Sequence, residues 1–299
     1  MIVIIGSINM DLVLRVPRMP LPGETITGGQ FRTIPGGKGA NQAVACARLR
    51  ADGIPVAMIG CLGDDAFGQQ LRAALRDDGV DDRHVSSIAD TASGIASILV
   101  DDQGQNSIVL AGGANHALSP AHIDAARDLI SQASIVVLQL ETPLATVQHA
   151  IAVVRALGKT VVLNPAPAQA LPQSLLAQVD YLVPNEIEAA MLAGMASDTS
   201  VSDLVAKLRA DGSSKLLITL GDKGVYAALT DGEQQFAAQA TKAIDTTAAG
   251  DTFIGGFVAA LAEGRSEAEA IAYGQRAAAL SVTRVGAQTS IPYRHELIN

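Results

Sequence analysis

The segment Asp245–Phe253 (DTTAAGDTF) combines a carboxylate with a run of small residues, just ahead of an apolar stretch that is typical of a helix. Ala248, Ala249 and Gly250 would expose consecutive backbone amides at the start of that helix. Such a cradle can stabilise the charge that develops on a transferred phosphoryl group. Asp251 would lie in the first turn, where its carboxylate could accept the proton of an attacking hydroxyl. An acidic residue that only complements the helix dipole would explain the carboxylate but not the small residues before it.

A glycine-rich stretch, Pro35–Ala43 (PGGKGANQA), precedes a second helical pattern. Three glycines in four positions allow close backbone approach and positive φ, and a helix N-terminus donates unpaired amides. The pattern is not the phosphate-binding loop, because that motif needs Ser or Thr after its Lys, and Gly39 follows Lys38 here. Contacts to sugar hydroxyls from backbone amides, with Lys38 and Asn41 as side-chain donors, fit better. A plain helix-start turn is the alternative.

An amide and a carboxylate follow the first apolar run of the chain, Ile2–Ile5. In an open α/β sheet, ligands bind at the carboxyl ends of strands, so Asn9 and Asp11 are placed to meet one. A carboxylate accepts hydrogen bonds from hydroxyls and an amide both donates and accepts them, which suits a polyol. The alternative is that both residues only cap the turn.

Two more strand ends carry polar residues. Pro184–Glu188 (PNEIE) follows the run Tyr181–Val183, and its acidic groups could hold Mg²⁺ directly or through water. They could equally be acidic residues in the first turn of a helix. Thr219–Gly224 (TLGDKG) follows another apolar run and suits the phosphates and base of a nucleotide, although the same residues would make an ordinary hairpin turn.

The elements that must position these residues alternate along the chain. Short apolar runs suit strands buried on both faces, and the amphipathic segments between them predict a three-layer α/β/α, doubly wound, mostly parallel sheet. The expected strands are Ile2–Ile5, Val56–Ile59, Ile135–Leu138, Thr160–Leu163, Tyr181–Val183, Leu216–Thr219 and Val225–Ala228. The expected helices are Gln42–Leu49, Gly68–Asp78, Pro120–Ser131, Pro143–Leu157, Val201–Arg209 and Ile254–Ala262.

Two stretches break this alternation. The first, about 11–34, carries prolines and then glycines between alternating apolar residues, and the second, about 94–109, alternates in the same way. We expect them to form a small inserted β-sheet that serves as a lid over the mouth of the larger sheet, with surface hairpins of no function as the alternative. No repeat or linker divides the chain, so we expect a single domain over residues 1–299.

Charge and composition argue against several classes of protein. A net charge of −9 is unfavourable for binding nucleic acid or an anionic membrane. No apolar run reaches the ~18 residues of a membrane span, and the first residues lack the basic region and cleavage site of a signal peptide. Cys46 and Cys61 show no metal-ligand spacing, which indicates a reducing compartment. We therefore expect a cytoplasmic protein that binds small molecules.

Together these segments resemble the ribokinase family of carbohydrate kinases, over essentially the whole chain. Gly36–Ala43 and Asp245–Phe253 resemble the two signature regions of the family. Gly113–Asn115 (GAN), Leu138–Glu141 (LQLE) and Asn164–Ala168 (NPAPA) are similar to its ribokinase branch. The resemblance implies ATP-dependent phosphorylation of the 5-hydroxyl of ribose, with Mg²⁺ and a monovalent cation, K⁺, as cofactors.

The resemblance also implies a role for each matched residue. Asp251 would be the general base, and Ala248, Ala249 and Gly250 the anion hole. The sugar would be bound by Asn9, Met10, Asp11, Gly37, Lys38, Gly39, Ala40, Asn41, Glu141 and Asp251. ATP would be bound by Asn185, Thr219, Leu220, Gly221, Asp222, Lys223, Gly224, Gly250 and Gln275. K⁺ would be held by Asp245, Thr247, Ser281, Arg284, Gly286 and Ser290, and Mg²⁺ indirectly by Glu188. The lid sheets of two subunits would meet in a homodimer.

Two residues depart from the family pattern. Met10 stands where a smaller residue is common, which would tighten the pocket, and Gln275 stands where His or Asn is frequent. Three competing hypotheses remain. The same chemistry could act on 2-deoxyribose, fructose or a nucleoside. A nicotinamide-dependent dehydrogenase would need Gly-x-Gly-x-x-Gly, which Gly6–Asp11 lacks. A sugar sensor could keep the fold without the chemistry, although an intact Asp251 argues against it.

Overall fold

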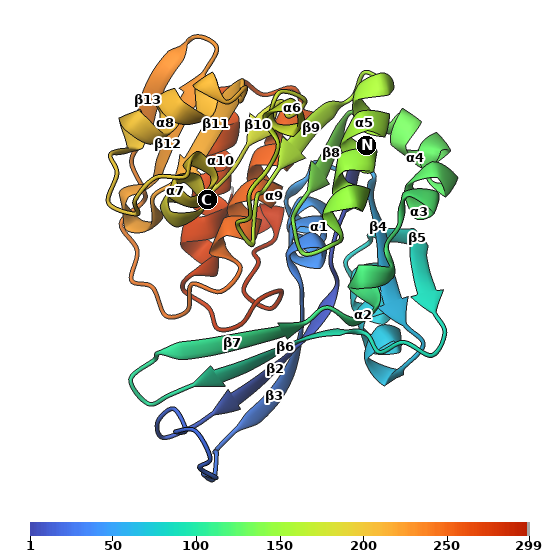
Figure 1. Ribbon diagram of the computed structural model, residues 1–299, viewed down its shortest axis with the longest axis vertical. Coiled ribbons are helices and arrows are strands. Elements are labelled where there is room, and N and C mark those ends of the chain that lie inside the picture. Colours follow the sequence, from blue (N-terminus) through green and yellow to red (C-terminus); the bar gives the residue numbers. More distant parts are fainter. Residues whose placement is uncertain (298–299) are drawn as a thin grey trace.

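The computed structural model describes residues 1–297, and in these residues the chain forms a nine-stranded sheet with helices on both faces (Figure 1). The strands are β1 (Ile2–Ile5), β4 (Val56–Gly63), β5 (Asp81–Ile88), β8 (Ile135–Leu138), β9 (Thr160–Leu163), β10 (Tyr181–Leu182), β11 (Lys215–Thr219), β12 (Val225–Leu229) and β13 (Gly232–Phe236). Their order is β13-β12-β11-β10-β9-β8-β1-β4-β5. Neighbours are parallel except β11 with β12 and β12 with β13, which are antiparallel.

Alternate residues of the central strands serve opposite faces of this sheet. In β1, Ile2 and Ile4 pack into one apolar core and Val3 and Ile5 into another. Burial on both faces explains why such strands appear in the sequence as continuous apolar runs. The first core is covered by α1 (Lys38–Leu49), α2 (Ala66–Asp77), α9 (Ala249–Ala262) and α10 (Glu267–Ser281). The second is covered by α3 (Pro120–Ala125), α4 (Arg127–Gln132), α5 (Leu144–Ala156), α6 (Gln173–Leu176), α7 (Glu186–Ala193) and α8 (Val201–Ala210).

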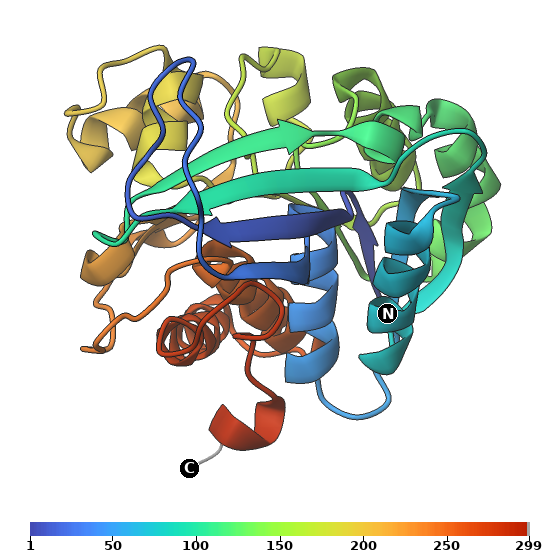
Figure 2. The same cartoon turned by 90° about the horizontal axis from the view of Figure 1, so that it is seen from below.

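A second, four-stranded sheet grows from the carboxyl end of β1. It consists of β2 (Asn9–Arg15), β3 (Phe31–Gly36), β6 (Gly94–Val100) and β7 (Asn106–Ala111), in the order β3-β2-β6-β7. β2 is parallel to β6 and antiparallel to β3, and β6 is antiparallel to β7. We call it the small sheet. It extends below the main sheet in Figure 1, and its strands lie across the body when seen from below in Figure 2.

The expected apolar strands are all present, with β4 running on to Gly63. Two further strands, β5 and β13, were not expected. They form the two edges of the main sheet, and an edge strand needs no continuous apolar run. The single helix expected over Pro120–Ser131 was wrong in one respect, because a turn at Ala126 separates α3 from α4.

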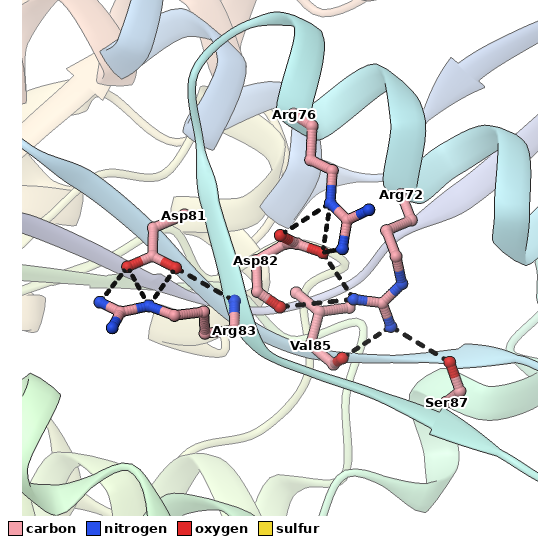
Figure 3. Close-up of polar contacts among 7 residues, drawn as sticks. All are labelled: Arg72, Arg76, Asp81, Asp82, Arg83, Val85 and Ser87. Atoms are coloured by element: carbon pink, nitrogen blue, oxygen red, sulfur yellow. Dashed lines mark hydrogen bonds and ion pairs between the residues drawn. The ribbon is translucent and has the colours of Figure 1, made fainter.

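Charged side chains hold the edge strand β5 to α2 (Figure 3). Arg72 and Arg76 donate to the Asp82 carboxylate at 2.7 and 3.1 Å. Arg72 also donates to the Val85 carbonyl (2.7 Å) and the Ser87 hydroxyl (3.1 Å). Val85 and Ile88 of β5 also pack against the two cores, so the edge of the sheet is held by charged hydrogen bonds in addition to apolar contacts.

Both cysteines, Cys46 and Cys61, are buried free thiols. Across residues 1–297, none of the helices combines the length and the apolar character that crossing a membrane requires.

Candidate active site

Asp251 lies in the first turn of α9, as expected. The helix begins at Ala249, directly after Ala248, whose φ of 58° lies in the left-handed region. A bulky or β-branched side chain would be strained at that φ, which accounts for a small residue there. The Thr252 amide donates to the Ala248 carbonyl (2.8 Å) and starts the helix. This turn fixes the position of the carboxylate.

The amides at the start of α9 border open space. Gly250 has no atom within 4 Å of where a side chain would stand, and it lines two cavities. Its amide has no acceptor within the described residues. The Ala249 amide, in contrast, donates to the Thr246 carbonyl (3.2 Å). One of the three expected cradle amides is therefore engaged within the chain, and the Gly250 amide stands at the wall of both cavities, beside the positive end of the helix dipole.

Two side-chain amides hold the carboxylate of Asp251. Asn41 Nδ2 donates to Asp251 Oδ2 (2.9 Å), and Gln42 Nε2 donates to Asp251 Oδ1 (2.8 Å). The aspartate is only 8% exposed. Burial raises its pKa, while the positive charge of Lys38 and the two amide donors oppose that rise. The result is a buried carboxylate with a raised pKa and a fixed orientation.

Lys38 is the cation at the centre of this group of acids. Burial lowers its pKa, but the negative charges of Asp251, Glu141 and Glu188 outweigh burial and leave the pKa raised. Lys38 also lines a cavity of about 220 Å³ together with Glu188 and Asp251. The ammonium group therefore keeps its charge and partly balances three carboxylates.

Polar residues from three strand ends meet on the other side of Asp251. Glu141 Oε2 accepts from Ser7 Oγ (2.6 Å), from the Lys38 amide (3.2 Å) and, at a longer distance, from Asn9 Nδ2 (3.5 Å). Asn115 Nδ2 donates to Asn9 Oδ1 (2.7 Å). The structure thus brings together Asn9 and Glu141, two of the expected sugar ligands that lie far apart in the sequence.

Asp11 is the second buried carboxyl of this region. Burial raises its pKa to about 7, and the nearby charges of Glu141 and Asp251 add to the rise. Its side chain has no hydrogen-bond partner within residues 1–297. A Cβ on Gly36 would stand 2.4 Å from Asp11 Oδ2, so only glycine leaves room for the carboxyl. Asp11 therefore has unused acceptor capacity for a ligand.

The glycines of the loop before α1 bring two backbone segments together. Gly37 has a φ of 88°, and a Cβ there would stand 2.7 Å from the Asn9 amide nitrogen. A Cβ on Gly39 would stand 2.6 Å from the Ser7 amide nitrogen. The glycines therefore allow the loop before α1 to pack closely against the turn between β1 and β2. Ala40 is packed in the first core.

Met10, in β2, is 1% exposed and belongs to the same core. Its side chain is therefore part of the packing beneath the site, and only its backbone is left to meet a ligand.

Two adjoining cavities run from Asp251 towards the turn after β11. The smaller, of about 220 Å³, is lined by Asn185, Glu188 and the start of α9. The larger, of about 460 Å³, is mostly apolar and is bordered by Gly221, Asp222, Gly224 and Gln275. Thr219, Thr246, Ala249 and Gly250 border both. A polar compartment followed by a larger apolar one suits a ligand with phosphates and a base.

Asn185 and Glu188 form a reciprocal cap at the start of α7. Asn185 Oδ1 accepts from the Glu188 amide (2.8 Å), and Glu188 Oε2 accepts from the Asn185 amide (2.9 Å). Burial raises the pKa of Glu188. The spacing Asn-x-x-Glu therefore has a structural reason in the capping box, and it also aligns one carboxylate with the smaller cavity.

The turn Leu220–Gly224 closes on itself, because the Leu220 amide donates to the Gly224 carbonyl (2.8 Å). Gln275 Nε2 donates to the Phe236 carbonyl (2.9 Å) and so fixes the segment after β13 that borders the larger cavity. Lys223 is exposed and lies 3.9 Å from Glu186. Gln275 thus holds the wall of the cavity in the position where a nucleotide ligand was expected.

The expected cation loop is assembled from two chain segments. Asp245 accepts from the Thr247 amide and hydroxyl (2.9 and 2.6 Å) and from the Gly286 amide (2.9 Å). The hydroxyls of Ser281 and Ser290 donate to carbonyls of their own segments, and the Arg284 side chain pairs with Glu296. Within residues 1–297, no three His, Cys, Asp or Glu side chains form a metal-binding group.

Several polar residues of this region were assigned no role from the sequence, although all except Ser7 lie in the segments that resemble the family. They are Ser7, Gln42, Asn115, Gln139 and Asn164, all of them buried. Gln139 and Asn164 directly follow β8 and β9, so the rule that placed Asn9 and Asp11 at a strand end would also have found them. Gln42 gave no such signal, because it lies inside a helix.

Comparison with known proteins is consistent along the whole chain. The model of the pfkB family of carbohydrate kinases matches residues 1–294. The ribokinase of Haemophilus influenzae is 45% identical over 297 residues, covering 99% of this chain and 96% of the relative. The deoxyribokinase of Salmonella typhi is 38% identical, covering 97% and 95%. The structure of Arabidopsis thaliana ribokinase complexed with ribose and ATP superimposes with a TM-score of 0.92 at 35% identity, covering 99% and 97%. This chain belongs to the pfkB family of carbohydrate kinases.

Proposed function

We propose that this protein transfers the γ-phosphoryl group of ATP to the 5-hydroxyl of ribose, with Asp251 as the general base. The observation that carries the proposal is the position of the Asp251 carboxylate. It belongs to the first turn of α9, which borders the two adjoining cavities, and it accepts a hydrogen bond from Asn41, one of the expected sugar ligands. A base in that position can reach both an acceptor hydroxyl and a phosphoryl donor.

The sugar would be held by groups that have unused hydrogen-bonding capacity. Within residues 1–297, the Asp11 side chain has no hydrogen-bond partner, and Asn41 Oδ1 is buried without one. Since Asn41 Nδ2 already donates to Asp251, Asn41 would accept from a sugar hydroxyl while holding the base. Asn9 and Glu141 would complete the polyol site.

The proton of the 5-hydroxyl would pass to Asp251 as the oxygen forms its bond to the γ-phosphorus. The bond from that phosphorus to the bridging oxygen breaks, and ADP leaves with the electron pair. Positioning and electrostatics are the main requirements of this reaction. Lys38 and the Gly250 amide would stabilise charge on the phosphoryl oxygens.

Two cations would assist. Mg²⁺ takes phosphate oxygens, waters and one or two carboxylates, so Glu188, whose Oε2 already accepts from the Asn185 amide, fits such an ion through water. When bound, Mg²⁺ would neutralise phosphate charge. A K⁺ ion fits the oxygens of Asp245 and Thr247 with the carbonyls around Gly286. The Arg284 side chain is already paired with Glu296, so only its backbone would serve.

We further propose a homodimer formed through the small sheet. Both edge strands of this sheet expose apolar side chains, namely Ile108, Val109 and Leu110 on β7 and Phe31 on β3. Exposed apolar edge strands are uncommon in a monomer, because they offer unpaired backbone groups to another chain.

The test measures ADP release with ATP, Mg²⁺ and K⁺, using ribose, 2-deoxyribose and fructose in parallel. We expect the highest kcat/KM with ribose. A higher kcat/KM with 2-deoxyribose would keep the mechanism and change the substrate. The similarity to a deoxyribokinase makes 2-deoxyribose the second candidate substrate. No ADP release with any of these sugars from folded protein would contradict the proposal.

A further inference from the structure

We infer that Gln42 is a positioning residue for the general base: a chain of buried side-chain amides, anchored on the backbone carbonyl directly after β10 and passing through Gln42, sets the orientation of the Asp251 carboxylate. The inference deepens the proposed function and depends on it for the role of Asp251. It adds a residue for which a ligand contact was neither expected nor found.

Gln42 lies in the first turns of α1 and is fully buried. Its Nε2 donates to Asp251 Oδ1 (2.8 Å) and to Asn164 Oδ1 (3.2 Å), and its Oε1 accepts from Gln139 Nε2 (2.6 Å). Both hydrogens of its amide nitrogen and its oxygen are therefore used. A glutamine that only filled space in the core would not need two acceptors and one donor from three separate parts of the fold.

The direction of the hydrogen bonds along this chain is fixed by a backbone group. The carbonyl of Val183, at the end of β10, can only accept, and it accepts from Asn164 Nδ2 (2.9 Å). Asn164 Oδ1 must then face Gln42, so Gln42 must present its nitrogen there and to Asp251. The opposite orientation would turn an amide oxygen towards a carboxylate.

Consecutive residues of α1 thus hold the two oxygens of the base. Asn41 donates to Oδ2 and Gln42 to Oδ1. Each carboxylate oxygen has two acceptor positions, so one on each remains for the substrate hydroxyl. The two bonds fix the plane of the carboxylate, and this plane decides where a hydroxyl proton can be received.

The far end of the chain is fixed by packing. Gln139 is 1% exposed, and its Oε1 is buried with no hydrogen-bond partner among the residues that the structure describes. A Cβ on Gly6 would stand 1.9 Å from that oxygen. The glycine at the end of β1 therefore leaves room for the amide that orients Gln42.

The charges that face Asp251 make this support necessary. Lys38 attracts the carboxylate, while Glu141, Asp11 and Glu188 repel it. Without the Gln42 donor, the carboxylate loses one of two fixed bonds and one of the interactions that favour its charged form. The acid limb of the pH dependence of kcat should then move to higher pH, and the base should lose its alignment.

The experiment compares wild-type protein with Gln42→Met, which keeps the volume and removes the amide. We expect kcat to fall about 10²-fold, the cost of a misplacement of about 1 Å, with the KM for ribose little changed and the acid limb shifted upward. Gln139→Met keeps the donor to Asp251 but frees Gln42, and should show a smaller change in the same direction. Thr146→Val is the matched control, because it removes a buried hydrogen bond from α5 to the Leu118 carbonyl, and α5 covers the opposite face of the main sheet from α9.

A second readout does not depend on turnover. The carboxyl carbon of Asp251, identified by its absence from Asp251→Asn protein, is titrated by ¹³C NMR in wild type and Gln42→Met, and we expect its midpoint at higher pH in the variant. An unchanged midpoint with unchanged kcat in folded Gln42→Met, or an equal loss of kcat in Thr146→Val, would overturn the inference. If Gln42→Met does not fold, unchanged titration and kcat in Gln139→Met would do the same. Failure of the proposed function is distinct, since Asp251→Asn would then retain activity.

Discussion

At the residue scale, the site is a set of buried and half-buried carboxylates near one lysine. Asp251, Glu141 and Glu188 act on Lys38 through their charges, and within residues 1–297 none of them forms a close ion pair with it. Such an arrangement costs stability, because buried charges are poorly solvated. It leaves acceptors available for hydroxyls and a cation available for phosphate. The raised pKa of Asp11 and of Asp251 is the physical signature of this arrangement.

The Asp11 carboxylate should therefore lower the stability of the folded protein and contribute to sugar binding. Its pKa of about 7 lies above the ordinary value of 3.8, so the folded protein binds the proton more tightly than the unfolded chain does. The free energy of unfolding should fall as pH rises from about 4 to about 7. Asp11→Asn should raise that free energy by about 2–4 kcal/mol at pH 8 and have little effect at pH 4, while raising the KM for ribose. Denaturant unfolding at both pH values tests this, and equal stability of variant and wild type at pH 8 would contradict it.

The positions of the site residues could be predicted from the sequence only in part. Asp251, Asn9 and Asp11 could be found because they follow strand or helix boundaries where ligands bind. Gln42 could not, since a buried polar residue inside an Ala-rich helix gives no local signal of what it touches. The hydrogen bond from Asn41 to Asp251 could not be predicted either, because it depends on how α1 packs against α9. Contacts between segments about 210 residues apart are set by tertiary packing alone.

At the element scale, the fold follows from which strands are buried on both faces. The central strands gave continuous apolar runs and could be predicted within a few residues. β5 and β13 could not be predicted, because an edge strand is half exposed and needs no continuous apolar run. β5 carries the charged residues Asp81, Asp82 and Arg83, and β13 has the sequence GEQQF. Side chains on neighbouring helices bond to both strands, Arg72 of α2 to β5 and Arg209 of α8 to Glu233 of β13.

The bonds between α2 and β5 should make a measurable contribution to stability. Burial raises the pKa of Asp82, but hydrogen bonds from Arg76 and Arg72 outweigh it and leave the pKa lowered. Its contribution is therefore present above about pH 4 and lost as pH falls through the folded-state pKa. Asp82→Asn should destabilise the protein by about 1–3 kcal/mol at pH 7, and kcat should stay unchanged.

Thermal unfolding at pH 7 and pH 3 measures this contribution. The pH trend is opposite to that of Asp11→Asn, so the two variants serve as mutual controls. A variant that is as stable as wild type at pH 7 would show that the ion pairs contribute nothing measurable.

At the scale of the whole molecule, the main sheet and the small sheet have different roles. The main sheet and its helices align strand ends and helix starts at one edge. The small sheet begins at the same edge, because only three residues separate the end of β1 from the start of β2. Asn9 and Asp11 therefore belong to both the acceptor site and the first strand of the small sheet. Movement of this sheet relative to the body would carry the two proposed sugar ligands with it.

The apolar edges of the small sheet predict association. Val109 is 67% exposed on the edge strand β7. Val109→Lys should weaken the dimer, because a charge on an edge strand opposes strand pairing. Light scattering coupled to gel filtration should give about twice the chain mass for wild type and a shift towards one chain mass for the variant. The exposed Arg83→Lys on β5 is a matched control that should leave the mass unchanged, and monomeric wild-type protein would contradict the dimer.

The most direct test of the central claim is single-turnover phosphorylation of ribose by Asp251→Asn. The asparagine keeps the size of the side chain but cannot accept the proton, and general-base catalysis contributes about 10²–10⁴-fold. We predict that kcat falls by at least about 10³-fold while ribose and ATP still bind with wild-type affinity, measured by calorimetry on the same preparation. A variant that binds both ligands and turns over at near wild-type rate would contradict the assignment of Asp251 as the base.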